Sequence, residues 1–386
     1  MIIKSILDQD LYKFSTSYAY MKNFPDAEGT FEFFDRNKTK MSQEIIEKIN
    51  IEINNLCALK LGKDEFDYLV SSIKYIPQHY WEWLRGFQYD PGKISISQTK
   101  EGYLSISVTD KLYKVTLWET MILCIVSEVY NQNKKLDLNQ VYTNLDQKIE
   151  FANSMKIYFS EFGTRRRFSK TVQDKVIEGL KERSETCTGT SNVYFAMKYD
   201  MKPIGTHPHE WFMFHGAMFG YKMANYVALE NWVKTYDGDL GIALTDTYTT
   251  DVFFKNFSKK HAKLFDGIRQ DSGDEIEFIE KAVTRYKEHG INPLTKTIIF
   301  SNGLDFRKAW EINNACKGKI NAAFGIGTNL TNDCGHCPMN IVMKLTKCRM
   351  NSKQSWSSCI KLSDDLGKHL GPYKEVETCK YECGIC

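Results

Sequence analysis

The chain has 386 residues, of which 42% are hydrophobic and 13% aromatic, so it can bury a sizeable core and is not globally disordered. Its 51 basic and 48 acidic residues leave a formal net charge of +3, which argues against nucleic acid as the main partner. The longest apolar run of the first half, Met121 to Val126, is too short to cross a membrane, and the opening residues lack a signal peptide's apolar core. We therefore expect a cytoplasmic protein without a membrane span.

Residues 1–115 are expected to form an α+β domain. The apolar spacing from Ile45 to Leu61 predicts a helix. Alternation of apolar and polar residues in 94–97 and 104–108, with a turn between them, predicts the two strands of a hairpin.

From about Leu117 the pattern changes to long helical stretches that alternate with short apolar strands at 242–244, 297–300 and 320–324. This order suits βα units with a parallel sheet, and we place this domain at residues 116–344. Each strand runs into polar residues, which is where an α/β barrel builds its active site, although an open doubly wound sheet has the same pattern. Residues 345–386 are expected to pack with the N-terminal domain.

One helix of this region has clear boundaries. Ser272 and Glu275 predict a capping box at its start. Its predicted apolar face consists of Ile276, Ile279 and Val283. The helix N-terminus, with Ser272 and Gly273 at its mouth, is a potential anion site.

Two segments have the composition of phosphate sites. Gly325-Ile326-Gly327-Thr328 follows a strand, and its glycines let backbone N–H groups approach an oxyanion, although a tight turn explains them equally well. Arg165-Arg166-Arg167 can bind pyrophosphate or a carboxylate, against the alternative of a solvated face with one structural ion pair. Three neighbouring arginines cannot all point the same way, so we expect one or two in a site.

His207 and His209 lie in Gly205-Thr206-His207-Pro208-His209-Glu210. A neutral imidazole can attack phosphorus and later release the phosphoryl group, but a histidine is as often structural. The spacing is not that of a zinc protease, and Pro208 breaks a helix there. Asp246, Asp271 and Asp274 are candidates to orient the histidine, to hold Mg²⁺ or to bind ribose; the alternative is helix capping, which fits Asp274 best.

Seven of the eleven cysteines lie between Cys334 and Cys386, an uneven placement that argues against a secreted disulfide framework. Cys334-x-x-Cys337 and Cys383-x-x-Cys386 have the spacing of a zinc knuckle. The alternative is reduced thiols, and we expect this tail to be metal-free and reduced.

Several motifs, in order, resemble those of nicotinate phosphoribosyltransferase. They are Asp10-Leu11-Tyr12-Lys13, the segment 162–169 around the arginines, Gly189-Thr190-Ser191-Asn192, the histidine segment 205–212, Asp246-Thr247-Tyr248, Arg269 to Asp274, and Phe324 to Leu330. The resemblance extends to about Lys347. The segment after Leu345 is less similar to the family, and we interpret it as touching none of the site motifs.

The resemblance implies an irregular α/β barrel with an N-terminal α/β sandwich (α+β) domain. It implies transfer of phosphoribosyl from phosphoribosyl pyrophosphate to nicotinate, giving nicotinate mononucleotide and pyrophosphate with Mg²⁺, in NAD salvage. It further implies that ATP hydrolysis drives the reaction through a phosphohistidine, and that the enzyme is a homodimer with a shared active site.

Residue roles follow from the same resemblance. His209 rather than His207 corresponds to the phosphohistidine, and Asp246 to the carboxylate that holds it. The implied substrate-binding residues are Phe162 and, from the neighbouring subunit, Tyr12 around the pyridine ring, Arg165 and Arg269 beside ring and ribose, Ser191 for the choice of ring, Asp271 and Ser272 at a strand end, and Gly303, Gly325, Gly327 and Thr328 for the 5′-phosphate.

Two other functions stay open. A nicotinamide phosphoribosyltransferase shares the implied fold but has an aspartate at the position of Ser191, where a serine does not repel a carboxylate. A catalytically silent, zinc-bearing binding protein is the alternative from another class, but it has no need to keep His209, Asp246 and the arginines together. Quinolinate is a less suitable substrate, because no added lysine cluster is present for its second carboxylate.

Overall fold

The computed structural model describes residues 1–205, 207–365 and 369–385. The chain divides into two compact units. The first comprises Met1–Tyr18, Thr30–Gly205 and Ile326–Lys344, and the second comprises Ala19–Gly29, Thr206–Gly325 and Leu345–Cys386. This division differs from the boundary placed at 115/116, because residues 116–205 group with the N-terminal region and residues after 344 group with the second unit.

The first unit contains part of a sheet in which β1 (Glu28–Asp35), β3 (Leu104–Lys111) and β2 (Ile94–Gln98) are neighbours in that order, and β2 and β3 pair antiparallel. Ile94 pairs with Val108 and Gln98 with Leu104, so the predicted hairpin is confirmed. Buried and half-buried residues alternate along β1, as expected for a strand with one face on a core.

The helix expected from Ile45 to Leu61 is present but shorter. It is α2 (Gln43–Asn54), capped by Ser42, and it continues only as a 3₁₀ turn over Asn55–Ala58. Its buried residues, Ile46, Ile49 and Ile53, have the spacing that predicted it.

The rest of the first unit is mainly helical. α6 (Trp118–Asn131) is buried along nearly its whole length, and the short strands β4 (Phe159–Glu161) and β5 (Cys187–Thr190) pair in parallel. The other helices and the last strand are α1 (Leu11–Asn23, which continues into the second unit), α3 (Lys63–Ser72), α4 (Gln78–Gly86), α5 (Leu112–Val115), α7 (Leu138–Met155), α8 (Lys170–Arg183), α9 (Val193–Lys198), α16 (Thr328–Thr331) and β10 (Ile341–Arg349, shared with the second unit).

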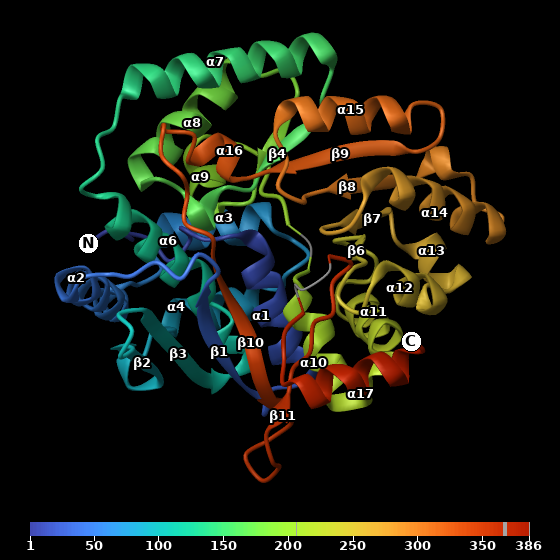
Figure 1. Cartoon of the computed structure of the whole chain (residues 1–386), viewed down its shortest axis with the longest axis horizontal. Helices are drawn as coiled ribbons and strands as arrows, with labels where there is room; N and C mark the ends of the chain where they lie inside the picture. The colour runs from blue at the N-terminus through green and yellow to red at the C-terminus, as the bar shows by residue number, and fades with distance from the viewer. Residues whose placement is uncertain (206, 366–368, 386) are drawn as a thin grey trace. The chain divides into compact units, whose positions relative to one another are not determined.

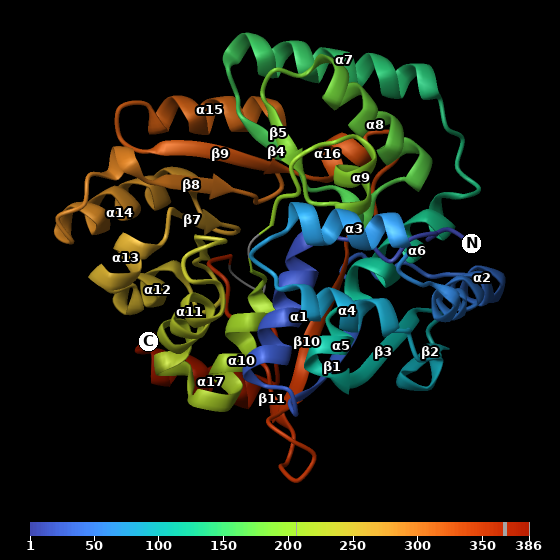
Figure 2. The same cartoon turned by 180° about the vertical axis from the view of Figure 1, so that it is seen from behind.

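The second unit is an α/β structure around parallel strands in the order β9-β8-β7-β6 (Figure 1). These strands span Asn321–Ile326 (β9), Thr297–Phe300 (β8), Gly267–Gln270 (β7) and Ile242–Leu244 (β6). The predicted strands at 242–244 and 297–300 have the observed bounds, whereas the third, predicted at 320–324, begins one residue later and ends two residues later. The α/β class is therefore confirmed. Helix α15 (Phe306–Cys316) runs beside β9 in both views (Figure 1 and Figure 2).

The other elements of this unit are α10 (His209–Phe219), α11 (Ala224–Tyr236), α12 (Thr250–Asn256), α13 (Lys259–Leu264), α14 (Glu275–Glu288), β11 (Ser357–Ser358) and α17 (Tyr373–Cys383). No helix in the described part of the chain has the length and apolar composition that crossing a bilayer requires.

The start of α14 corrects one prediction. Asp274, not Ser272, is the N-cap, and its side chain accepts from the backbone N–H of Glu277. The Ser272 hydroxyl instead donates to Asp246, 2.6 Å away. Ile276 is also 46% exposed, so it does not belong to the buried face. That face consists of Phe278, Ile279, Ala282, Val283 and Tyr286.

Candidate active site

His209 is the first residue of α10, a helix that is buried over most of its length. Pro208 precedes it in extended backbone geometry, which stops the helix from starting earlier. Trp211, Phe212 and Phe214 are fully buried. Because the core holds the helix this firmly, the imidazole at its N-terminus has a defined position.

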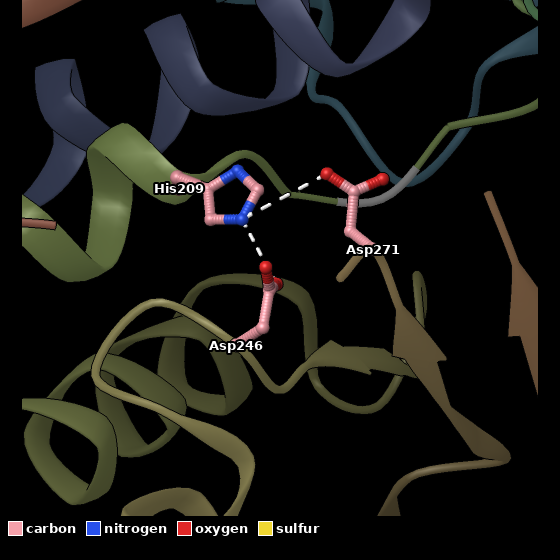
Figure 3. Close-up of side chains that lie close together, drawn as sticks. All are labelled: His209, Asp246 and Asp271. Atoms are coloured by element: carbon pink, nitrogen blue, oxygen red, sulfur yellow. Dashed lines mark hydrogen bonds and ion pairs between the residues drawn. The ribbon is translucent and has the colours of Figure 1, made fainter. Parts of the chain in front are cut away.

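The His209 imidazole faces two carboxylates from neighbouring strand ends (Figure 3). Its Nε2 lies 2.9 Å from Oδ1 of Asp246 and 3.9 Å from Oδ2 of Asp271. Asp246 follows β6, and Asp271 follows β7, where it accepts from the Ser301 hydroxyl at 2.6 Å. The polar ends of adjacent parallel strands therefore meet, as their order predicted.

Lys361 completes this cluster, and the sequence analysis did not identify it. Its Nζ lies 2.9 Å from His209 Nε2 and 3.6 Å from Asp246 Oδ2. The interpretation that the C-terminal segment touches none of the site motifs was wrong. No local pattern marks Lys361, because its partners lie far away in the sequence.

The charges around His209 favour a neutral imidazole beside an ionised Asp246. Burial lowers the pKa of His209, and Lys361 lowers it further, against the opposing effect of Asp246. Burial alone would raise the pKa of Asp246, but His209 and Lys361 hold it well below its usual range. Nε2 cannot donate to Asp246 and accept from Lys361 at once. Because the buried carboxylate needs a donor, we assign the proton to Nε2, which leaves the lone pair on Nδ1.

His207 lies in a different environment from His209. It is fully buried, its ring centroid is 4.7 Å from that of Trp232 and 5.0 Å from that of Phe212, and neither of its ring nitrogens has a hydrogen-bond partner among the described residues. Burial holds its pKa well below the usual value. These surroundings suit a core residue, whereas His209 has the charged neighbours Asp246, Asp271 and Lys361.

Among the described residues, His209, Asp246 and Asp271 form the one group of three or more histidine, cysteine or carboxylate ligands, with ligand atoms within 4.8 Å of one another. Within this described part of the chain, no such group contains Cys334, Cys337 or Cys383. Cys386, the fourth residue of the predicted knuckle, lies outside the described residues.

The arginine triplet of the first unit diverges, as expected. Arg167 is fully buried and binds Asp8 through two hydrogen bonds, at 2.7 and 3.0 Å. Arg166 donates from Nε to the Ile341 carbonyl at 2.9 Å. The Arg165 side chain is 41% exposed, whereas that of Arg167 is fully buried, so Arg165 can present its guanidinium to a substrate.

Arg165, Tyr12 and Ser191 lie in one polar cluster of the first unit. The Arg165 guanidinium is 5.7 Å from the centroid of the Tyr12 ring of the same chain and 3.5 Å from Asp10. The Ser191 hydroxyl donates to Asp10 at 2.6 Å. Burial raises the pKa of Asp10, and Arg165 opposes the rise. Asp10 is thus a second site neighbour that the sequence analysis did not single out as functional.

Two of the predicted loops pack backbone against backbone. The N–H of Phe162 donates to the carbonyl of Ile326 at 2.8 Å, and a Cβ on Gly327 would lie 3.0 Å from the Phe162 carbonyl oxygen. This close approach accounts for Gly327 without a ligand. Thr328 begins α16 directly after it.

The remaining predicted residues lie in the second unit. Gly325 is part of β9, and Gly303 has a φ of 60°, which suits glycine in the turn after β8. Arg269 is in β7, and its Nε is buried without a hydrogen-bond partner among the described residues. Such a donor requires a water molecule or a ligand atom as acceptor.

An imidazole held by a carboxylate at the ends of parallel strands is an arrangement typical of group-transfer enzymes of the α/β class. Comparison with known proteins is more specific. Residues 157–379 match the nicotinate phosphoribosyltransferase (NAPRTase) family, and residues 7–127 match the NAPRTase N-terminal domain.

Individual relatives agree over almost the full length. The chain is 41% identical to nicotinate phosphoribosyltransferase of Desulforapulum autotrophicum and 42% identical to that of Chromohalobacter salexigens, in each case over 98% of both chains. The crystal structure of nicotinate phosphoribosyltransferase from Porphyromonas gingivalis is 50% identical, with a TM-score of 0.98 and complete coverage of both chains. That from Vibrio cholerae is 34% identical, with a TM-score of 0.93 over 100% of this chain and 95% of the other. The chain belongs to the nicotinate phosphoribosyltransferase family.

Proposed function

We propose that the protein transfers the phosphoribosyl group of phosphoribosyl pyrophosphate to nicotinate, forming nicotinate mononucleotide and pyrophosphate for NAD salvage. We further propose that ATP hydrolysis drives this transfer through a phosphohistidine at His209. The family membership supports the transfer. The observation that carries the ATP step is the 2.9 Å contact between His209 Nε2 and the buried Asp246 carboxylate.

The chemistry of the histidine follows from its protonation. With the proton on Nε2 and bound to Asp246, the Nδ1 lone pair is available to attack the γ-phosphorus of ATP. Positive charge then develops on the imidazole, and the Asp246 carboxylate stabilises it. Ser272 donates to the other oxygen of Asp246, at 2.6 Å, and so fixes the orientation of that carboxylate.

Magnesium fits the same cluster. Mg²⁺ prefers oxygen ligands and keeps several waters, so Asp246 and Asp271 would hold it together with phosphate oxygens. When bound, the ion would neutralise negative charge on the leaving phosphate or pyrophosphate.

The polar cluster of the first unit suits an anionic aromatic substrate. The Tyr12 ring offers a stacking surface, and Arg165 offers a half-exposed guanidinium for the nicotinate carboxylate. The Ser191 hydroxyl donates its hydrogen bond to Asp10 in this structure, so a nicotinate carboxylate would have to replace Asp10 as the acceptor. Nicotinamide is therefore kept as the second candidate substrate.

Labelling with γ-³²P ATP tests the ATP step. We expect an acid-labile, base-stable label on the wild type and on His207→Ala, and none on His209→Ala. A label that persists in His209→Ala and disappears in His207→Ala would show that His207, and not His209, carries the phosphoryl group. A parallel turnover assay with nicotinate and nicotinamide decides between the two substrates.

A further inference from the structure

We propose that Lys361 binds the phosphoryl group on His209 and thereby stabilises the phosphorylated enzyme. The inference rests on the proposed function, since it needs the phosphohistidine to form. Its motivation is the position of the Lys361 ammonium, 2.9 Å from Nε2 of His209. Since Nε2 keeps its proton for Asp246, Lys361 has no acceptor at Nε2 and is available to a phosphoryl group on Nδ1 once its side chain turns toward it.

The backbone around Lys361 is attached to the loops that form the site. The N–H of Leu362 donates to the carbonyl of Thr247, next to Asp246, at 2.8 Å. Asp364 accepts from the N–H and the hydroxyl of Thr250, at 2.8 and 2.6 Å, and its own N–H donates to the Ser272 hydroxyl at 3.1 Å. Residues 362–364 are thus hydrogen-bonded to the loop that carries Asp246 and to Ser272, which binds the Asp246 carboxylate. These bonds hold the backbone of Lys361 next to His209.

The local charge calls for a cation. Asp246 and Asp271 both face His209, and a phosphoryl group adds roughly 1.5 to 2 further negative charges at neutral pH. Among the described residues, the cation in contact with the His209 ring is Lys361, whose Nζ lies 2.9 Å from Nε2. Without it, the phosphorylated state would lose the ammonium charge that lies beside His209 in this structure.

The proposed step is balanced as follows. The Nδ1 lone pair forms a bond to the γ-phosphorus of ATP, the bond from that phosphorus to the bridging oxygen breaks, and ADP leaves with the electron pair. Asp246 keeps accepting from Nε2. Lys361 neither gains nor loses a proton: its ammonium moves from Nε2 to a phosphoryl oxygen, which its flexible four-carbon stem allows.

The alternative is that Lys361 only compensates the buried charge of Asp246, 3.6 Å away, and so keeps His209 in place. The two roles differ in what they change. A residue that only orients His209 alters the rates of phosphorylation and of its reversal by ADP together, and leaves their ratio unchanged. A residue that binds the phosphoryl group changes the equilibrium between the two states of the enzyme.

The test is therefore an equilibrium measurement on the full chain. The fraction of labelled enzyme is determined at fixed ATP, ADP and Mg²⁺, approached both from free enzyme with ATP and from labelled enzyme with ADP. Lys361→Met should lower the equilibrium constant for phosphorylation about 10- to 100-fold, the range of a hydrogen bond to a charged group. Lys361→Arg, which keeps the charge, should stay within a few-fold of the wild type.

Two further variants make the result decisive. Lys374→Met is the matched control, because Lys374 is an exposed lysine of α17 in the same unit, and it should label like the wild type. Lys361→Gln keeps a polar end without charge, and it should lower the equilibrium constant for phosphorylation as much as Lys361→Met does. If thermal unfolding shows that Lys361→Met is misfolded, Lys361→Gln takes its place in the test.

An unchanged equilibrium constant in both uncharged variants, or an arginine variant as poor as they are, would overturn the role of Lys361. If the wild type itself takes no label from ATP, the ATP step of the proposed function fails instead.

Discussion

Replacing Gly163 by alanine should destabilise the protein by about 2–4 kcal/mol, because the added methyl group has no room. Its Cβ would lie 2.2 Å from Oγ1 and 2.5 Å from Cγ2 of Thr331, and 2.8 Å from the carbonyl oxygen of Gly327. Thr331 is fully buried, and its hydroxyl donates to the Gly163 carbonyl at 2.9 Å, so it cannot turn away without loss. Overpacking of this kind costs about 1–3 kcal/mol, and the lost hydrogen bond adds about 1 kcal/mol.

Urea unfolding measures this cost as a shift of the midpoint at constant slope. The matched control is Gly86→Ala at the end of α4, where a Cβ meets nothing within 4 Å and the change should be neutral or stabilising by up to about 1 kcal/mol. Equal midpoints for the two variants would refute the reasoning. Thr331→Ala removes the nearest clashing atoms, so the double variant with Gly163→Ala should cost less than the sum of the two single changes. Strictly additive costs would place the strain elsewhere.

The Gly163→Ala substitution should also weaken the binding of nicotinate. Gly163 lies between Phe162 and the arginine triplet, so displacing it moves two of the residues implied in nicotinate binding. We expect a higher KM for nicotinate in Gly163→Ala at a temperature where the variant is folded, and no such change in Gly86→Ala.

Three other predictions concern residues other than Gly163. Ser191→Asp should weaken nicotinate use, because its carboxylate would lie beside that of Asp10 and repel the substrate; an unchanged preference in nicotinate–nicotinamide competition would place the specificity elsewhere. If the active site is shared between subunits, mixing Tyr12→Ala and His209→Ala chains should restore part of the activity, and hybrid dimers that stay inactive would count against sharing. Burial raises the pKa of Glu161 to about 7. The folded protein then binds more protons than the unfolded chain between about pH 4.5 and 7, so stability should fall as pH rises through this window, by at most about 1.4 kcal/mol per unit. Glu161→Gln should flatten this slope in urea titrations at several pH values, and a slope equal to that of the wild type would show that Glu161 is not its source.

The parts of the fold that could be predicted depend on patterns within a few consecutive residues. The strand at 242–244 and the strand at 297–300 each combine a few apolar residues with a polar end, and both were placed with the observed bounds. The hairpin was visible because alternation has a period of two, which few other structures share. Asp246 and Asp271 follow from the rule that strand ends of a parallel sheet converge, whereas the choice of His209 over His207 came from the resemblance to the family.

The errors have tertiary causes. Ser272 and Asp274 are both good N-caps, and the sequence does not reveal that Asp246, 26 positions away, takes the Ser272 hydroxyl. Lys361 is 152 positions from His209 and Asp10 is 181 from Ser191, so no window of sequence contains either pair. Charged residues found by such long-range contacts require the folded structure.

The interleaved composition of the second unit has a consequence for how the protein is made. This unit needs residues from Ala19–Gly29, from Thr206–Gly325 and from Leu345–Cys386. On the ribosome, the helix that carries His209 therefore emerges long before Lys361 and its neighbours. Contacts of such sequence separation close late and fold slowly. The site around His209 can therefore be completed only after residues 345–386, which carry Lys361, have been synthesised.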